Sequence, residues 1–127
     1  MSTILVTGGL GFVGGRIARK LSAGHQVIIS SRNKVSPESL ALHGRVQQAA
    51  HNDLLSKDTF PRDIDTVIHM AALNEHDCVR HPSEAIRVNI DETRIVLENS
   101  IAAGVQHFIY FSTAHVYASP LKGSITE

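Results

Sequence analysis

The strongest fold signal in this 127-residue chain is the stretch Thr7-Gly8-Gly9-Leu10-Gly11-Phe12-Val13-Gly14. It follows a short apolar run that starts at Ile4 and is too short for a helix, so residues 4–7 are predicted to form a buried strand. After the glycines, apolar residues recur at near-helical spacing as far as Leu21, and Gly24 ends the pattern. The stretch is therefore expected to be the turn between a strand and a helix.

Two glycine spacings overlap in this turn. Gly9, Gly11 and Gly14 give G-x-G-x-x-G, whereas Gly8, Gly11 and Gly14 give G-x-x-G-x-x-G. In a dinucleotide-binding fold such glycines permit a tight turn, a close approach of the backbone to a pyrophosphate, and close packing of helix on strand. The N-terminus of the helix also attracts phosphate. A structural turn without a ligand is the alternative, but the strand before and the helix after favour the binding interpretation.

Strand-like and helix-like segments alternate along the rest of the chain. This alternation predicts a single domain over residues 1–127, with an α/β, Rossmann-type doubly wound parallel sheet in strand order 3-2-1-4-5 and helices on both faces. Residues 34–44, 53–62 and 73–83 are interpreted as connections, the second as a short helix or loop and the third as turn-like. The apolar stripe of the long helix is expected to be a core face formed by Ile86, Ile90, Leu97 and Ile101. Strands are predicted at residues 4–7, 27–29, 45–49, 66–71 and 107–112, and helices at about 12–21 and 82–103.

Composition narrows the class of protein. Hydrophobic residues make up 43% and charged residues 19%, and twelve Lys and Arg balance twelve Asp and Glu, which suits a globular domain and makes a nucleic-acid binder a poor interpretation. No apolar run approaches the length of a membrane span. The eight histidines lack metal-site spacing, so no metal is expected, and His69 is interpreted as a packed, hydrogen-bonded residue. The single cysteine, Cys78, fits a reducing cytoplasm.

The end of the second predicted strand bears on the choice of cofactor. An acidic residue there would bind the ribose hydroxyls of NAD, but this chain has Ser31 followed by Arg32. An arginine at this point can hold a 2′-phosphate, with Ser30 or Ser31 as hydroxyl donors. The sequence therefore favours NADP over NAD, with a solvated surface charge as the alternative role of Arg32.

Five segments, in order, resemble the extended short-chain dehydrogenase/reductase family, which includes nucleotide-sugar epimerases and dehydratases. The glycine stretch resembles the cofactor loop of that family, and the other four segments resemble its adenine-binding pair, fourth strand, long helix and active-site strand. Together they extend the resemblance, in register, over residues 4 to 127. The four are Asn52-Asp53-Leu54, Val67-Ile68-His69-Met70-Ala71-Ala72, Val88-Asn89-Ile90-Asp91-Glu92-Thr93 and Phe111-Ser112-Thr113-Ala114-His115-Val116-Tyr117.

The resemblance implies roles for particular residues. Asp53 would accept a hydrogen bond from the adenine amino group, with Leu54 beside the ring. Thr113 stands four residues before Tyr117, as the catalytic Ser or Thr of the family stands, and its hydroxyl would bind the reacting substrate oxygen. The other implied cofactor contacts are Gly8, Gly11, Phe12, Val13, Gly14, Met70, Ala71, Ala72, Asn74 and Asn89.

Two features depart from the family pattern. The acidic residue after the second strand is replaced by Ser31 and Arg32, and the general acid/base pair Tyr-x-x-x-Lys is missing, because Ala114 follows Tyr110 by four residues and Leu121 follows Tyr117. The simplest interpretation is an N-terminal fragment that ends before this pair. Such a fragment is expected to bind cofactor without turnover.

The resemblance implies an NAD(P)-dependent enzyme of the epimerase/dehydratase type, acting on a nucleotide-linked sugar or a similar hydroxyl or carbonyl substrate. A non-catalytic NAD(P)-binding sensor or regulatory module is the alternative, since it needs no Tyr-x-x-x-Lys. In this family the long helix commonly takes part in dimers. Self-association is also expected because a missing sixth strand would leave the fifth strand as an unpaired edge.

Overall fold

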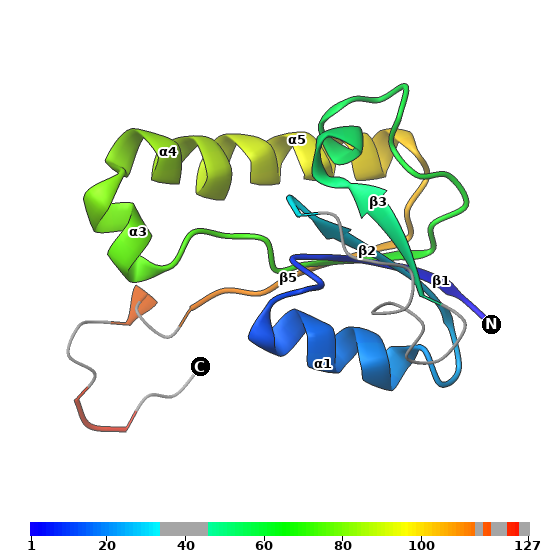
Figure 1. The fold of residues 1–127 in the computed structure, drawn as a ribbon, viewed down its shortest axis with the longest axis horizontal. Coiled ribbons are helices and arrows are strands. Elements are labelled where there is room, and N and C mark those ends of the chain that lie inside the picture. The colour runs from blue at the N-terminus through cyan, green and yellow to red at the C-terminus, as the bar shows by residue number, and fades with distance from the viewer. Residues whose placement is uncertain (34–45, 114–115, 118–121, 125–127) are drawn as a thin grey trace.

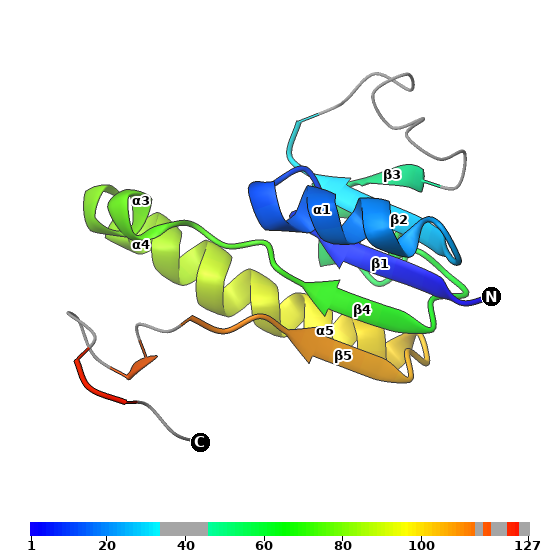
Figure 2. The same ribbon diagram turned by 90° about the horizontal axis from the view of Figure 1, so that it is seen from below.

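The computed structural model describes residues 1–33, 46–113, 116–117 and 122–124. Its centre is a five-stranded parallel sheet in the order β3-β2-β1-β4-β5, which confirms the predicted topology (Figure 2). The predicted connection 34–44 lies outside the described residues. The strands are β1 (Thr3–Thr7), β2 (Gln26–Ser31), β3 (Val46–Ala50), β4 (Thr66–His69) and β5 (His107–Tyr110).

Helices cover both faces of the sheet (Figures 1 and 2). Helix α1 (Phe12–Leu21) lies on one face. The other face carries the 3₁₀ turn η1 (His51–Leu55) and a nearly continuous helical stretch. Within the part of the chain that the structure describes, no helix is long and apolar enough to cross a membrane. The nearly continuous helical stretch on the second face consists of α3 (Glu75–Arg80), α4 (Pro82–Ile86), the π-helical turn η2 (Arg87–Glu92) and α5 (Thr93–Ala102).

The central strands are buried on both sides, as short β-branched runs in a parallel sheet should be. Val6 and Ile29 point toward α1, whereas Leu5 and Val67 point toward α5 and pack with Leu54. The alternation along β1 therefore joins two apolar cores, one on each face. These cores hold the carboxyl ends of the strands at one edge of the sheet.

One predicted connection is wrong. Residues 73–83 were expected to be turn-like, but they contain α3. The Asn74 side chain caps this helix by accepting a hydrogen bond from the Asp77 backbone N–H at 3.0 Å, and it donates one to the Asp77 carboxylate at 2.8 Å. The Asn-x-x-Asp spacing was a helix-start signal that the polar composition of the segment obscured.

The long helical segment over 82–103 is confirmed, but the prediction of its buried face is wrong. Ile86, Ile90, Leu97 and Ile101 are all exposed, by between 38% and 68%. The π-helical turn η2 adds residues to one turn and so changes which side chains face the sheet. Two of the polar residues buried instead have distant partners, Glu92 with His51 and Asn99 with the Leu54 carbonyl. The residues of this stretch that are buried are Val88, Glu92, Val96, Asn99 and Ser100.

Candidate functional site

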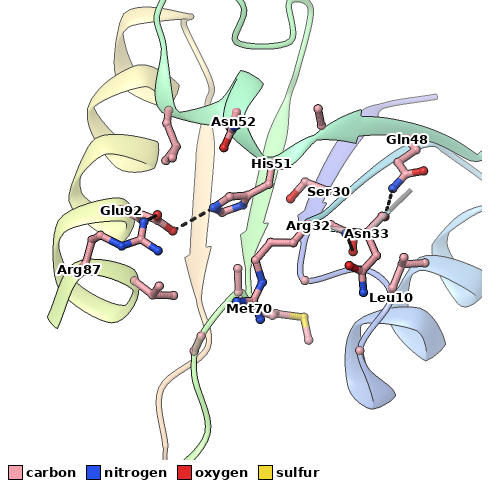
Figure 3. Close-up of a pocket in the computed structure, with 18 residues that line it drawn as sticks. Leu10, Ser30, Arg32, Asn33, Gln48, His51, Asn52, Met70, Arg87 and Glu92 are labelled. Carbon is pink, nitrogen blue, oxygen red and sulfur yellow. Dashed lines mark hydrogen bonds and ion pairs between the residues drawn. The ribbon is translucent and has the colours of Figure 1, made fainter. Parts of the chain in front are cut away.

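A pocket of about 880 Å³ opens where the carboxyl ends of the strands meet (Figure 3). In a doubly wound sheet this edge, near the point where the strand order reverses beside β1, is where ligands bind. The glycine turn forms one wall and the ends of β2 and β3 form another. The lining residues are Gly8, Leu10, Gly11, Ser30, Ser31, Arg32, Asn33, Gln48, Ala50, His51, Asn52, Leu55, Met70, Ala71, Ala72, Arg87, Val88 and Glu92.

The glycine turn needs glycine for two physical reasons. Gly8 has φ +67°, a conformation that L side chains rarely adopt, and it lies against the backbone of Ala71. A Cβ on Gly14 would collide with the backbone of Gly8 and Gly9. The turn is therefore tight enough to bring the start of α1 to the pocket.

Helix α1 begins on Gly11 as its N-cap, with no acidic residue in its first turn. The N–H groups of Phe12, Val13 and Gly14 lie in the first turn, where no helical carbonyl four residues earlier can accept from them. They are therefore available to an anion. The Phe12 side chain is 78% exposed, and the Arg16 guanidinium stacks on it at 3.7 Å from the ring centroid. Phe12, Val13 and Gly14 are not among the residues that line this pocket.

The end of β2 brings Ser31 and Arg32 to the pocket, as the sequence predicts. Ser31 Oγ accepts a hydrogen bond from the Asn33 N–H at 3.2 Å, and Gln48 Nε2 donates to the Asn33 carbonyl at 2.7 Å, so the turn after β2 is tied to β3. Among the described residues no carboxylate forms an ion pair with Arg32. Its guanidinium is available to an anionic ligand.

The Ser30 hydroxyl supplies a test of whether a polar ligand fits this pocket. Ser30 is 1% exposed, and its Oγ is the only buried side-chain N or O atom without a hydrogen-bond partner in the described part of the chain. Burying an unpaired hydroxyl costs free energy. Ser30 is one of the residues that line the pocket. A wall that contains a hydroxyl without a protein partner fits a polar ligand better than an apolar one.

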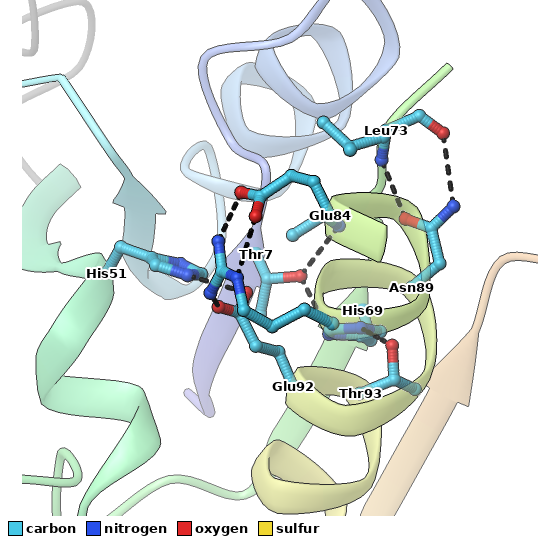
Figure 4. A network of polar contacts seen from close by, with 10 residues as sticks. Thr7, His51, His69, Leu73, Glu84, Asn89, Glu92 and Thr93 are labelled. Atoms are coloured by element: carbon cyan, nitrogen blue, oxygen red, sulfur yellow. Dashed lines mark hydrogen bonds and ion pairs between the residues drawn. The ribbon is translucent and has the colours of Figure 1, made fainter. Parts of the chain in front are cut away.

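A hydrogen-bond network shapes the end of β4 (Figure 4). Thr7 Oγ1 accepts from the N–H groups of Met70 at 2.9 Å and Ala71 at 3.0 Å, so both of its lone pairs are used. Its proton must then go to His69 Nδ1, 2.9 Å away, and the other ring nitrogen of His69 donates to Thr93 Oγ1, also at 2.9 Å. His69 is thus neutral, and the prediction that it is a packed, hydrogen-bonded residue is confirmed.

A second pocket, of about 600 Å³, shares Met70, Ala71 and Ala72 with the first. The predicted catalytic residue Thr113 lines it. The three shared residues run between the two pockets, so one elongated ligand can lie along them. Val13, His69, Leu73, Asn74, Glu75, Cys78, Asn89, Thr93, Tyr110, Phe111 and Ser112 complete the lining.

Two predicted cofactor residues in this second pocket have their side chains engaged by the protein. Asn89 Oδ1 accepts from the Leu73 N–H at 2.7 Å, and Asn89 Nδ2 donates to the Leu73 carbonyl at 3.3 Å. Asn74 caps α3. In this structure both side chains shape the chain after β4.

Asp53 and Leu54 are not brought to either pocket. The Asp53 carboxylate accepts from the Ala50 N–H at 3.3 Å, and the Leu54 side chain is fully buried in the core on the α5 side. Their immediate neighbours His51, Asn52 and Leu55 line the first pocket instead. The adenine roles of Asp53 and Leu54 remain predictions from resemblance.

Sequence reasoning missed a charged cluster in the pocket wall. Glu92 is paired with Arg87 and with His51, and Arg87 also pairs with Glu84. The hydrogen bond from Arg87 lowers the pKa of Glu84. Glu92 lies in a segment that the sequence marks only as helical, and its partner His51 is 41 residues away, so no local signal pointed to the pair. No group of described residues could hold a metal ion.

Comparisons with known proteins agree with this geometry. The family model described as "NAD dependent epimerase/dehydratase family" matches residues 4–127. A UDP-glucose 4-epimerase from Neisseria meningitidis serogroup A is 31% identical over 100% of the chain, and one from Mus musculus is 34% identical over 94% of it. The structure resembles UDP-glucose 4-epimerase from Bifidobacterium longum in complex with NAD+ and UDP, with a TM-score of 0.83 and 30% identity over 99% of the chain.

The match covers only part of each relative. The chain corresponds to 41% of the Neisseria enzyme, 40% of the mouse enzyme and 41% of the Bifidobacterium chain. It therefore spans about two fifths of the length of these relatives, and within that part it has their fold.

Proposed function

We propose, from the premise that this chain belongs to the NAD dependent epimerase/dehydratase family, that it is the cofactor-binding portion of an enzyme acting on a nucleotide-linked sugar. The observation that carries the proposal is the pocket that starts at the glycine turn, contains the unpaired Ser30 hydroxyl and continues along Met70–Ala72 to Thr113. A dinucleotide is long enough to occupy both pockets.

Different elements of the pocket would bind different parts of the cofactor. The N–H groups at the start of α1 would hold the diphosphate, and the end of β2 would hold the adenosine ribose. When bound, the nicotinamide supplies a hydride acceptor or donor. Thr113, in the second pocket, would bind the reacting substrate oxygen and stabilise charge on it.

For the cofactor we propose NADP, with NAD as the alternative that the relatives support. The Bifidobacterium structure contains NAD+, so the coarser assignment to a nicotinamide dinucleotide does not depend on this choice. NADP is favoured here because Arg32 lines the pocket at the end of β2 without an ion-pair partner among the described residues, and no carboxylate follows that strand before Glu38.

Arg32→Ala is expected to lower the affinity for NADPH by about tenfold and to leave the affinity for NADH within about twofold, because only NADPH carries the 2′-phosphate. Titration calorimetry or quenching of protein fluorescence on the purified protein measures both. Arg19→Ala, in the last turn of α1, is the matched control because Arg19 lines neither pocket. An unchanged ratio of the two affinities in Arg32→Ala would show that the arginine has no such role.

A non-catalytic NAD(P)-binding module is the second candidate. The observation that favours it is that no lysine stands four residues after either tyrosine of these 127 residues. Turnover of a UDP-hexose by the complete gene product decides in favour of the enzyme, whereas cofactor binding without turnover by the same product decides in favour of the module. We propose that these 127 residues alone bind cofactor and do not turn over.

We also propose self-association, which the exposed apolar residues support. Ile86, Ile90 and Ile101 project from the helical stretch, and Tyr110 is 56% exposed on β5, at the edge of the sheet. Light scattering is expected to give a mass above 13.8 kDa for this chain. A monodisperse monomer at high concentration would contradict it.

A cytoplasmic location is part of the same proposal and is supported by the lone cysteine.

A further inference from the structure

The charged cluster in the pocket wall is not explained by binding of the diphosphate or the ribose. Glu92 is 5% exposed, and its two carboxylate oxygens are both engaged, Oε2 by His51 Nε2 at 2.9 Å and Oε1 by Arg87. A buried carboxylate is costly unless it is paired and hydrogen-bonded in this way. The cluster therefore holds the His51 ring in one position at the pocket wall (Figure 3).

The partners of His51 determine which of its nitrogens carries the proton. A carboxylate can only accept, so Nε2 must be the donor toward Glu92. Arg87 also pairs with this carboxylate. In the neutral form of an imidazole that donates through Nε2, Nδ1 carries the lone pair. None of the described residues donates a hydrogen bond to His51 Nδ1. A hydrogen-bond acceptor of fixed orientation is thus left without a partner in the wall of the pocket.

The place of His51 in the fold indicates which part of a dinucleotide would reach it. The end of β2, with Ser31 and Arg32, is where a ribose is held in this fold. His51 follows β3, the next strand outward from the glycine turn. The base attached to that ribose would lie there, between apolar groups of Leu55 and Val88, which line the same pocket.

We propose that His51 is a specificity-determining residue whose Nδ1 accepts a hydrogen bond from the exocyclic amino group of adenine, with Glu92 and Arg87 as positioning residues. This inference rests on the proposed function, because it requires a dinucleotide in the pocket. Asp53 is the rival for the same amino group, but its carboxylate accepts from the Ala50 N–H and lines neither pocket.

The probe is the hypoxanthine analogue of NADPH, which has a carbonyl oxygen where adenine has the amino group. In the wild-type protein this oxygen would face the lone pair of His51 Nδ1, so NADPH is expected to bind about five- to tenfold more tightly than the analogue. In His51→Ala the preference is expected to fall to less than about twofold. His107→Ala, on an exposed histidine of β5, is the matched control and should keep the full preference.

Two further variants, Glu92→Ala and Asp53→Ala, test whether His51 or Asp53 accepts the hydrogen bond from the adenine amino group. Glu92→Ala is expected to reduce the preference, since the ring loses the group that fixes its proton, whereas Asp53→Ala should retain it. A wild-type preference that survives in His51→Ala, or that disappears in Asp53→Ala alone, would overturn the inference while leaving the proposed function intact. Failure of the wild-type protein to bind either dinucleotide would overturn both.

A measurement on the wild-type protein avoids any dependence on how well the variants fold. The ¹⁵N chemical shift of His51 Nδ1 is expected to move toward lower frequency when NADPH binds, because the lone pair becomes a hydrogen-bond acceptor, and to move less with the hypoxanthine analogue. Equal shifts with the two dinucleotides would contradict a contact with the amino group.

Discussion

Gly14→Ala is expected to weaken NADPH binding by at least about tenfold and to lower the free energy of unfolding by about 1–3 kcal/mol, the usual cost of overpacking. The added Cβ would overlap the backbone of Gly8 and Gly9, which cannot rotate away as a flexible side chain could. Either the turn or the start of α1 must move. The N–H groups at the start of that helix would then be displaced from the position in which we propose that they bind the diphosphate.

Gly15→Ala is the matched control because it makes the same change one residue later in the same helix. Its Cβ would lie 3.5 Å from the Gly9 carbonyl oxygen, an ordinary van der Waals contact. Alanine is the better helix former, so this variant is expected to gain about 0.5–1 kcal/mol and to bind NADPH as the wild type does. Urea unfolding and calorimetric titration measure the two effects. A Gly14→Ala protein as stable and as tightly binding as Gly15→Ala would refute the close-approach role of Gly14.

The sheet could be predicted from the sequence because its signals are local. Each central strand is four to six residues long and is built on a short apolar, β-branched run, and the crossover rule then leaves few possible orders. The Gly8–Gly14 turn has a fixed spacing for a steric reason that is also local. Ser31 and Arg32 could be placed at the pocket for the same reason, since they follow a recognisable strand.

The parts that could not be predicted depend on distant partners. Periodicity alone placed Ile90 in the core, yet the π-helical turn buries Glu92 there, and this is acceptable only because His51 and Arg87 meet it. Asn99 is buried because its side-chain amide donates to the Leu54 carbonyl, 45 residues away. Hydrophobic periodicity ranks residues by polarity and cannot detect such compensation.

Acidification is expected to destabilise the protein through His69, with a loss of about 2 kcal/mol in the free energy of unfolding between pH 7.5 and pH 5. Burial is the main reason that the pKa of His69 falls from 6.5 to about 4. Below pH 6.5 the His69 imidazole therefore binds a proton in the unfolded chain but stays neutral in the folded chain. The contribution of His69 to the free energy of unfolding is fully present above pH 6.5 and is lost as the pH falls toward 4.

The hydrogen bonds explain why the folded state resists that proton. Protonation of His69 Nδ1 would set two donors against each other, because the Thr7 hydroxyl can donate only to His69 while it accepts from Met70 and Ala71. Urea unfolding of His69→Gln, which cannot titrate, is expected to show a pH dependence smaller by about the same 2 kcal/mol, whereas His107→Gln should follow the wild type. Parallel pH profiles for the wild type and His69→Gln would mean that His69 takes up its proton in the folded state. The segment after β4 would then tolerate a charged imidazole, and the Thr7 hydroxyl would not be what holds Met70 and Ala71 beside the pocket.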